Sequence, residues 1–148
     1  GTPFLHKDTF ARGRGLFHAI EYRPPAEIVD QDYPIWLTTG RNFSHYHTGT
    51  MTRNSPALEH EISEGFLEIN LADAEDLDLK PGDAVRISSR RGTITARTRV
   101  TERIRPGTVF MPFHFIENNV NLLTNPAMDP IAKIPELKVC AVKLEKAV

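Results

Sequence analysis

The sequence predicts a mainly β fold, a pseudo-symmetric β barrel with a few short helices, in one domain of ordinary size. Its apolar residues lie in short runs that alternate with polar residues and end at glycine, proline or asparagine, as in half-buried strands. The segment LKPGDAV at 79–85 is echoed by IRPGTVF at 104–110, so two similar turns each lead into a strand. With 148 residues, the chain is long enough for a stable core without a disulfide or a metal.

The first 32 residues are expected to be an arm or linker from a preceding domain, and residues 33–148 to be the barrel domain. The arm mixes turn residues with scattered aromatics, has one candidate strand at 16–22, and stiffens at the RPP sequence of 23–25. The chain starts at Gly1 with no initiator methionine, which indicates a segment of a longer protein.

Short helices are expected after Ser55 and after Asn70. Pro56 suits the first turn of a helix that runs to about His60. Asn70 is the expected N-cap of a second helix at 71–77, which carries acids in its first turns. Strands are expected at 35–37, 66–69, 84–88, 93–100, 108–111 and 137–144, with a tight hairpin turn at 90–92.

Charge is balanced over the whole chain but divided into blocks along it. The net charge of −1 gives no reason to expect nucleic acid or an anionic membrane as a partner. Nine carboxylates and one lysine lie between Glu59 and Asp83, and seven arginines and one glutamate lie between Ala84 and Arg105. We expect folding to interleave the two blocks as weak surface ion pairs.

The segment TTGRNFSHYHTGTMTR at 38–53 has the composition of an anion site. It combines hydroxyls, histidines and glycines with Arg41 and Arg53, and no carboxylate occurs between Tyr33 and Leu58. Arginine offers forked donors to phosphate, and glycine lets the backbone approach a ligand closely. The alternative is a surface loop that binds nothing, and we favour the anion site.

A second candidate region follows the strand at 108–111. Phe113, His114 and Phe115 are followed by an amide cluster at Asn118, Asn119 and Asn121. Amides pair with the donors and acceptors of a heterocycle, and aromatic rings supply stacking faces. An asparagine-rich turn explains the cluster equally well, because asparagine tolerates left-handed backbone conformations.

Metal binding and nucleophilic catalysis have weaker support. His45 and His47 project to one side if their segment is extended, as a metal pair does, but no third ligand has a recognisable spacing. The single cysteine, Cys140, lies in an apolar strand and is expected to be a packed side chain. No nucleophile elbow, P-loop or dinucleotide fingerprint occurs. The residues therefore predict a binding module for an anionic ligand that carries a heterocycle.

Three blocks of sequence, in order, carry a resemblance to a known family. The segment TTGRNFSHYHTGTMTR, followed by MPFHFIENNVNLLT and DPIAKIPELKVCAV, closely resembles the C-terminal molybdopterin guanine dinucleotide-binding domain of the molybdenum and tungsten oxidoreductases. The N-terminal GTPFLHKDTFARGRGLFHAI is most similar to the catalytic (alpha) subunit of formate dehydrogenases. The resemblance implies a six-stranded double-psi β barrel that caps a bis-(molybdopterin guanine dinucleotide) cofactor of molybdenum or tungsten.

The resemblance also implies which residues contact the cofactor. Those positions are Thr39, Gly40, Arg41, Asn42, Phe43, Ser44, His45, Tyr46, His47, Thr48, Phe113, Asn121 and Lys138. None of them is a metal ligand or a catalytic residue, since the family carries these and an iron-sulfur cluster in earlier domains. The chain alone is therefore expected to be inactive.

The implied parent reaction is the oxidation of formate to carbon dioxide. A nitrate reductase domain and a free-standing barrel that acts as an adaptor are the alternatives. The implied partners are the cofactor, the preceding domains of the same subunit and electron-transfer subunits, without nucleic acid or membrane contact. The expected location is the cytoplasm, and neither the choice between molybdenum and tungsten nor the electron acceptor follows from the residues.

Overall fold

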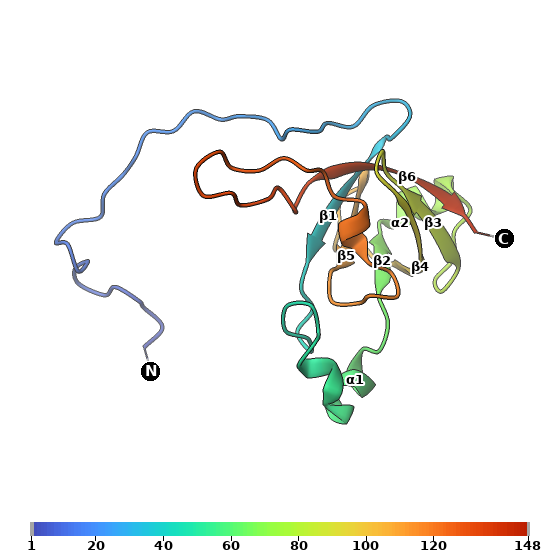
Figure 1. Ribbon diagram of the computed structural model, residues 1–148, viewed down its shortest axis with the longest axis horizontal. Coiled ribbons are helices and arrows are strands. Elements are labelled where there is room, and N and C mark those ends of the chain that lie inside the picture. Colours follow the sequence, from blue (N-terminus) through green and yellow to red (C-terminus); the bar gives the residue numbers. More distant parts are fainter. Residues whose placement is uncertain (1, 148) are drawn as a thin grey trace.

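A computed structural model describes residues 2–147, and its centre is a closed barrel of six strands (Figure 1). Around the barrel the strands follow the order β1-β5-β2-β4-β3-β6. Their bounds are β1 Ile35–Gly40, β2 Phe66–Ile69, β3 Ala84–Ser88, β4 Thr93–Val100, β5 Thr108–Pro112 and β6 Cys140–Lys146. The prediction of a mainly β, six-stranded double-psi barrel with short helices is confirmed.

The strand pairings are pseudo-symmetric. Strands β1 and β5 pair in parallel, as do β2 and β4, and all other neighbours are antiparallel. The symmetry exchanges β1 with β4, β2 with β5 and β3 with β6. Under this exchange the two parallel pairs replace each other, and every antiparallel pair becomes an antiparallel pair. The echoed turns lead into β3 and β5, which this symmetry does not relate. The repeated turn sequence therefore led to the correct prediction of a barrel, but the two turns are not equivalent positions of its symmetry.

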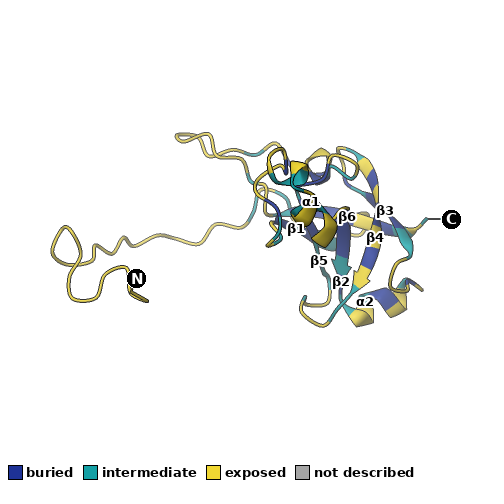
Figure 2. Cartoon of the chain, turned by 90° about the horizontal axis from the view of Figure 1, so that it is seen from below, coloured by how far each residue is buried: buried dark blue, intermediate teal, exposed yellow. Residues whose placement is uncertain are grey.

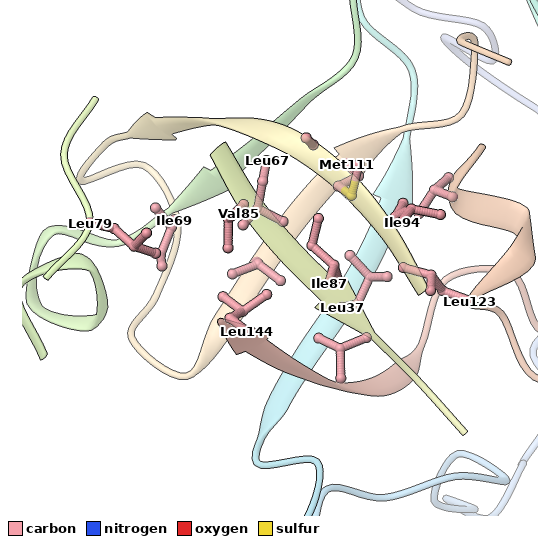
Figure 3. Close-up of a cluster of buried hydrophobic side chains, with 14 of the residues drawn as sticks. Leu37, Leu67, Ile69, Leu79, Val85, Ile87, Ile94, Met111, Leu123 and Leu144 are labelled. Atoms are coloured by element: carbon pink, nitrogen blue, oxygen red, sulfur yellow. The ribbon is translucent and has the colours of Figure 1, made fainter. Parts of the chain in front are cut away.

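The core lies inside the barrel and receives side chains from all six strands (Figure 3). Strand β4 shows the alternation plainly, because Ile94 and Ala96 are buried while Thr95 and Arg97 between and beyond them are exposed. Removal of apolar surface from water is the main force that stabilises such a fold. The six strands thus enclose an apolar core between them.

Short helices lie between the strands. Helix α1 spans Pro56–Glu61 and α2 spans Leu71–Asp76, with single 3-10 turns at Thr52–Asn54 (η1) and Val120–Leu122 (η2). Of these, α2 and η2 contribute Ala74 and Val120 to the core. The Asn70 side chain accepts a hydrogen bond from the Ala72 backbone N–H at 2.9 Å, which confirms it as the N-cap of α2. No helix within residues 2–147 is both long and apolar enough to cross a bilayer.

Residues 2–24 run away from the barrel as an exposed arm (Figures 1 and 2), while residues 26–30 lie against the barrel beside Arg90 and Arg91. The strand expected at 16–22 does not form, because no other strand lies beside this segment to accept its hydrogen bonds. The expected final strand is also shifted. It begins at Cys140, since residues 137 and 138 bond to Thr39 instead, and it continues to Lys146, which pairs with Val85 of β3.

The two charge blocks do not interleave as expected. Between them the structure forms one ion pair, Arg99 with Glu68, at 4.0 Å within residues 2–147. Arg90 and Arg91, in the β3–β4 turn, instead bind Glu27 of the arm. The prediction was wrong because the barrel places this turn beside residues 26–33, far from the acidic block in sequence.

Candidate functional site

The parallel pairing of β1 and β5 creates the candidate site. Parallel strands end at the same edge of a sheet, and Gly40 at the end of β1 lies opposite Pro112 at the end of β5. The Phe113 N–H continues this pairing and donates to the Gly40 carbonyl at 3.2 Å. The two regions that the sequence singled out, residues 41–53 and 113–121, therefore leave the barrel together.

His114 joins two points of the loop at 41–53, Asn42 and His47. Its ring is buried, with 1% of the residue exposed, and its Nε2 accepts a hydrogen bond from the Asn42 N–H at 3.0 Å. Its other nitrogen, Nδ1, contacts the His47 carbonyl and donates to it. Burial lowers the pKa of His114; the hydrogen bond to the His47 carbonyl raises it in part, and nearby basic side chains lower it further. The sequence placed His114 in the aromatic and amide region beside Phe113 and Phe115, but gave no sign of its role in holding the loop.

His45 and His47 do not form a metal pair. The His45 side chain is buried, its Nε2 donates to the Ile62 carbonyl at 2.6 Å, and its Nδ1 accepts from the Thr52 hydroxyl at 3.1 Å. His47 has a left-handed backbone with φ of 47°, so the segment between them is not extended. Within residues 2–147 no group of three His, Cys, Asp or Glu side chains is placed to hold a metal ion.

The two arginines of the loop differ in their partners. Arg53 is held between Glu59 and Glu117, with N–O distances of 3.1 and 2.9 Å, and these hydrogen bonds raise its pKa. Its charge is therefore already compensated, which overturns the interpretation of Arg53 as an anion ligand. Arg41 is exposed, makes no ion pair within residues 2–147, and lies with Nη2 3.3 Å from His47 Nδ1. Arg41 is the loop cation that remains available to an anion.

Thr39, Phe113 and Lys138 come together from three parts of the chain. The buried Thr39 hydroxyl donates to the Leu137 carbonyl at 2.7 Å, and its own carbonyl accepts from Lys138 Nζ at 2.7 Å. The same ammonium lies 5.7 Å from the centre of the Phe113 ring. This cluster fixes the start of the loop against the segment before β6.

A pocket of about 540 Å³ opens between the two loops. It is lined by Thr48, Gly49, Thr50, Arg53, Glu59, Phe113, His114, Phe115, Ile116, Asn119 and Asn121. The structure thus brings three of the predicted site residues, Thr48, Phe113 and Asn121, into one hollow. It also includes Thr50 and Asn119, which lie in the two candidate regions but were not among the predicted contact residues, and the parallel pairing of β1 and β5 brings them together.

The remaining predicted residues shape the loop or face solvent. Asn42 Oδ1 accepts from the backbone N–H groups of Ser44 and His45 at 3.0 and 3.1 Å, and so folds the turn. Phe43 and Tyr46 are exposed, and Gly40 is buried at the end of β1. Asn42 Nδ2 is buried without a hydrogen-bond partner in residues 2–147, so the loop keeps a free donor. A free amide donor beside a free arginine fits an anionic ligand with polar ring edges.

Cys140 has no features of a reactive thiol. It is buried in β6, and burial raises its pKa to about 11. The thiolate is the nucleophilic form, so a raised pKa suppresses reactivity at neutral pH. This agrees with the expectation of a packed side chain.

A closed barrel with an acid-poor loop and an aromatic and amide-lined pocket at one end defines a binding domain for an anionic, heterocyclic ligand. The family model described as the Molydopterin dinucleotide binding domain matches residues 35–141, and the chain belongs to this family. It is therefore a domain that binds a molybdopterin dinucleotide cofactor, which confirms the family resemblance of the sequence.

Three curated relatives are alpha subunits of formate dehydrogenases. The chain is 58% identical to the F420-dependent formate dehydrogenase subunit alpha of Methanocaldococcus jannaschii. It is 53% and 52% identical to the two F420-dependent formate dehydrogenase alpha subunits of Methanococcus maripaludis. Each alignment covers 99% of this chain, which spans 22% of the length of each relative.

A solved structure shares the fold. Acetylene hydratase from Pelobacter acetylenicus superposes with a TM-score of 0.74 over 86% of this chain and 21% of its own. At 16% sequence identity, the match concerns the fold alone.

Proposed function

We propose that this chain is the cofactor-capping domain of a formate dehydrogenase, and that it binds one side of a bis-(molybdopterin guanine dinucleotide) cofactor. The observation that carries the proposal is the identity of 52% to 58% with three formate dehydrogenase alpha subunits over 99% of the chain. The alignments extend over the arm as well as the barrel, so they include residues that the family model does not cover.

The residues at the end of β1 and β5 fit this cofactor. Arg41, which has no carboxylate partner in the described chain, suits a phosphate or an oxygen of the pterin. The unpartnered Asn42 amide and the Asn121 side chain at the pocket suit the donors and acceptors of a ring edge. Phe113 offers an aromatic face beside them.

Other predicted residues act by holding these groups in place. The side chains of His45 and Thr39 are buried and bonded within the protein, which supports a role for them in fixing the loop. When bound in the parent enzyme, the cofactor supplies the two-electron redox chemistry of formate oxidation, with molybdenum or tungsten. The residues of this chain bind it, orient it and exclude water from one side.

The parent enzyme is larger than this chain. We propose that preceding domains of the same subunit complete the cofactor site and carry the metal ligand and an iron-sulfur cluster. The relatives are F420-dependent by name, and we infer the same dependence for the parent, in the cytoplasm.

The proposal is tested with the complete parent polypeptide, purified without oxygen. We expect it to contain molybdenum or tungsten with a guanine dinucleotide, released on denaturation and identified by mass spectrometry. We expect it to reduce a dye with formate and not to oxidise a reduced dye with nitrate. Turnover of nitrate in place of formate, or a polypeptide without pterin, would refute the proposal.

A further inference from the structure

We propose that His114 is a positioning residue that holds the cofactor loop, residues 41–48, in its binding shape through its neutral Nδ1–H tautomer. The inference rests on the proposed function, because it assigns a role to the loop that would contact the cofactor. His114 lies in the second block of the family resemblance, but it is not among the residues predicted to contact the cofactor.

The geometry makes His114 a bridge across the loop. Its Nε2 accepts from the N–H of Asn42 and its Nδ1 lies against the carbonyl of His47, so one ring ties together residues five apart. The backbone of His114 is fixed, since the Phe113 N–H before it bonds to Gly40 at the end of β1. The ring therefore holds Asn42 and His47 at fixed positions relative to the edge of the barrel.

The hydrogen bonds determine the tautomer. A backbone N–H is only a donor, so Nε2 facing Asn42 must carry a lone pair. A carbonyl is only an acceptor, so Nδ1 facing His47 must carry the proton. A doubly protonated ring would place an N–H against the Asn42 N–H and break one of the two bonds. The loop shape thus requires the neutral imidazole.

The surroundings favour the same state. The ring is 1% exposed and packs against the aromatic rings of Phe113, Phe115 and His45, at centroid distances of 5.1, 6.0 and 5.7 Å. The charged or titratable groups that act on it are the basic side chains of His45, Arg41 and His47, all of which lower its pKa. Glu59, the carboxylate that lines the same pocket, is engaged by Arg53.

Protonation of His114 should therefore open the loop. Because the pKa of His114 is lowered in the folded chain, the folded state binds fewer protons than the unfolded state below about pH 6.5. Stability and loop closure are complete above that pH and decline as the pH falls toward the lowered pKa of the folded protein. The Asn42 hydrogen bond is the one that is lost.

Nuclear magnetic resonance of the 148-residue chain, without cofactor, tests the bridge directly. Ring nitrogen shifts should show the Nδ1–H tautomer and an imidazole whose pKa lies below its ordinary value of about 6.5. Hydrogen exchange at the Asn42 amide, corrected for the intrinsic rate, should lose protection at the pH where the ring protonates. An Nε2–H tautomer, or a titration near pH 6.5 without change at Asn42, would overturn the inference.

Two variants supply the matched comparison. His114→Phe keeps an aromatic ring but removes both hydrogen bonds, and should raise Asn42 exchange at least about tenfold relative to the Val109 amide in β5. His114→Gln offers one acceptor and one donor, and should restore part of the protection. In the parent enzyme, cofactor content should follow the same order, wild type, Gln and Phe.

The outcomes separate the two proposals. Lost Asn42 protection with unchanged cofactor content in the parent enzyme would overturn the inference, because loop shape would then not govern binding. A wild-type parent without any pterin would refute the proposed function, while the exchange data on the isolated chain would be unaffected. Should the Phe variant fail to fold, the pH titration of the wild type still decides the role of His114.

Discussion

Arg91 and Glu27 form a two-pronged ion pair, with Nη1 2.9 Å from Oε1 and Nη2 2.7 Å from Oε2. Arg91 also donates from Nε and Nη2 to the Leu123 carbonyl, at 2.9 and 2.8 Å. Burial alone would raise the pKa of Glu27, but hydrogen bonds from Arg91 and Arg90 outweigh it and lower that pKa. One guanidinium thus joins the end of the arm to the loop after η2.

Arg91→Ala should therefore destabilise the barrel. It leaves the Leu123 carbonyl without two donors and the half-buried Glu27 carboxylate with fewer partners, at a cost of about 1–3 kcal/mol. The free energy of unfolding in urea measures the effect. Arg97→Ala is the matched control, because Arg97 is exposed and makes one bond of 3.2 Å to the Gly82 carbonyl. Equal losses in the two variants would contradict the bridging role of Arg91.

The ion pair between Arg91 and Glu27 should make the free energy of unfolding depend on pH. The pKa of Glu27 is lowered on folding, so its contribution is present above its ordinary pKa of about 4.5 and is lost as the pH falls below that value. The decline in unfolding free energy on acidification should be shallower in Arg91→Ala than in the wild type.

A side chain at Gly49 should lower the stability of the fold for two reasons. Its φ is +76°, and an added Cβ would lie 2.8 Å from Arg53 Cδ and 3.0 Å from the His114 carbonyl oxygen. Arg53 cannot easily move, since Glu59 and Glu117 hold its guanidinium. We expect Gly49→Ala to cost about 2–4 kcal/mol of stability, as the sum of a left-handed residue and a steric overlap.

Gly82→Ala provides the matched control for this change. Gly82 has φ of +87° but open space where the Cβ would lie, so it should show the backbone cost alone, about 1–2 kcal/mol. Thermal denaturation of the two variants compares them. Similar melting temperatures would show that the loop rearranges freely around Gly49.

Arg41→Ala should weaken cofactor retention more than it weakens the fold. The side chain is exposed and makes no ion pair in the described chain, so its removal leaves the barrel intact. Loss of a charge that binds a ligand typically costs about 2–5 kcal/mol of affinity. Pterin content of the parent enzyme and melting temperature of the isolated chain measure the two effects separately.

The control for Arg41 is Arg86→Ala on the exposed side of β3, which should change neither quantity. A lowered melting temperature of Arg41→Ala with full pterin content would show that Arg41 is a structural residue.

The sequence correctly predicted those strands that have recognisable turn residues at both ends. The strands at 66–69, 84–88 and 93–100 match β2, β3 and β4 to the residue, because each is a short apolar or alternating run between clear turn signals. The last strand was misplaced because its start is determined by a distant contact, the bonds of residues 137 and 138 to Thr39. The candidate strand in the arm had the right composition but lacks a neighbour.

The sequence predicted the types of residue at the site, but not which of them form hydrogen bonds and ion pairs with other parts of the chain. Arg41 and Arg53 look alike in an acid-free window, and only the fold shows that Glu59 and Glu117 reach Arg53 from outside it. His45 and His47 also look alike, yet one ring is buried and bonded and the other is exposed. A local pattern identifies the donors, whereas long-range pairing determines which of them remain free for a ligand.

The isolated chain presents one wall of the cofactor site, so it should bind a guanine nucleotide weakly. Fewer contacts must offset the same ordering cost of association. We expect GDP to bind with a dissociation constant of roughly 1 mM, a binding free energy of about −4 kcal/mol. Amide shifts in a nuclear magnetic resonance titration should concentrate in residues 39–48, with smaller shifts at Asn121 and Lys138.

Three comparisons show whether the nucleotide binds at the loop and through which groups. CDP, which keeps the phosphates and changes the base, should bind more weakly if the Asn42 and Asn121 amides contact the guanine ring. Added salt should weaken both nucleotides, and Arg41→Ala should weaken them to a similar extent, because phosphate contacts are electrostatic and are screened by ions. The exposed arginines on β3 and β4 are the alternative anion site on this barrel. Shifts centred on residues 86–105, equal for GDP and CDP, would place the nucleotide there and would show that the loop at 38–53 does not bind it.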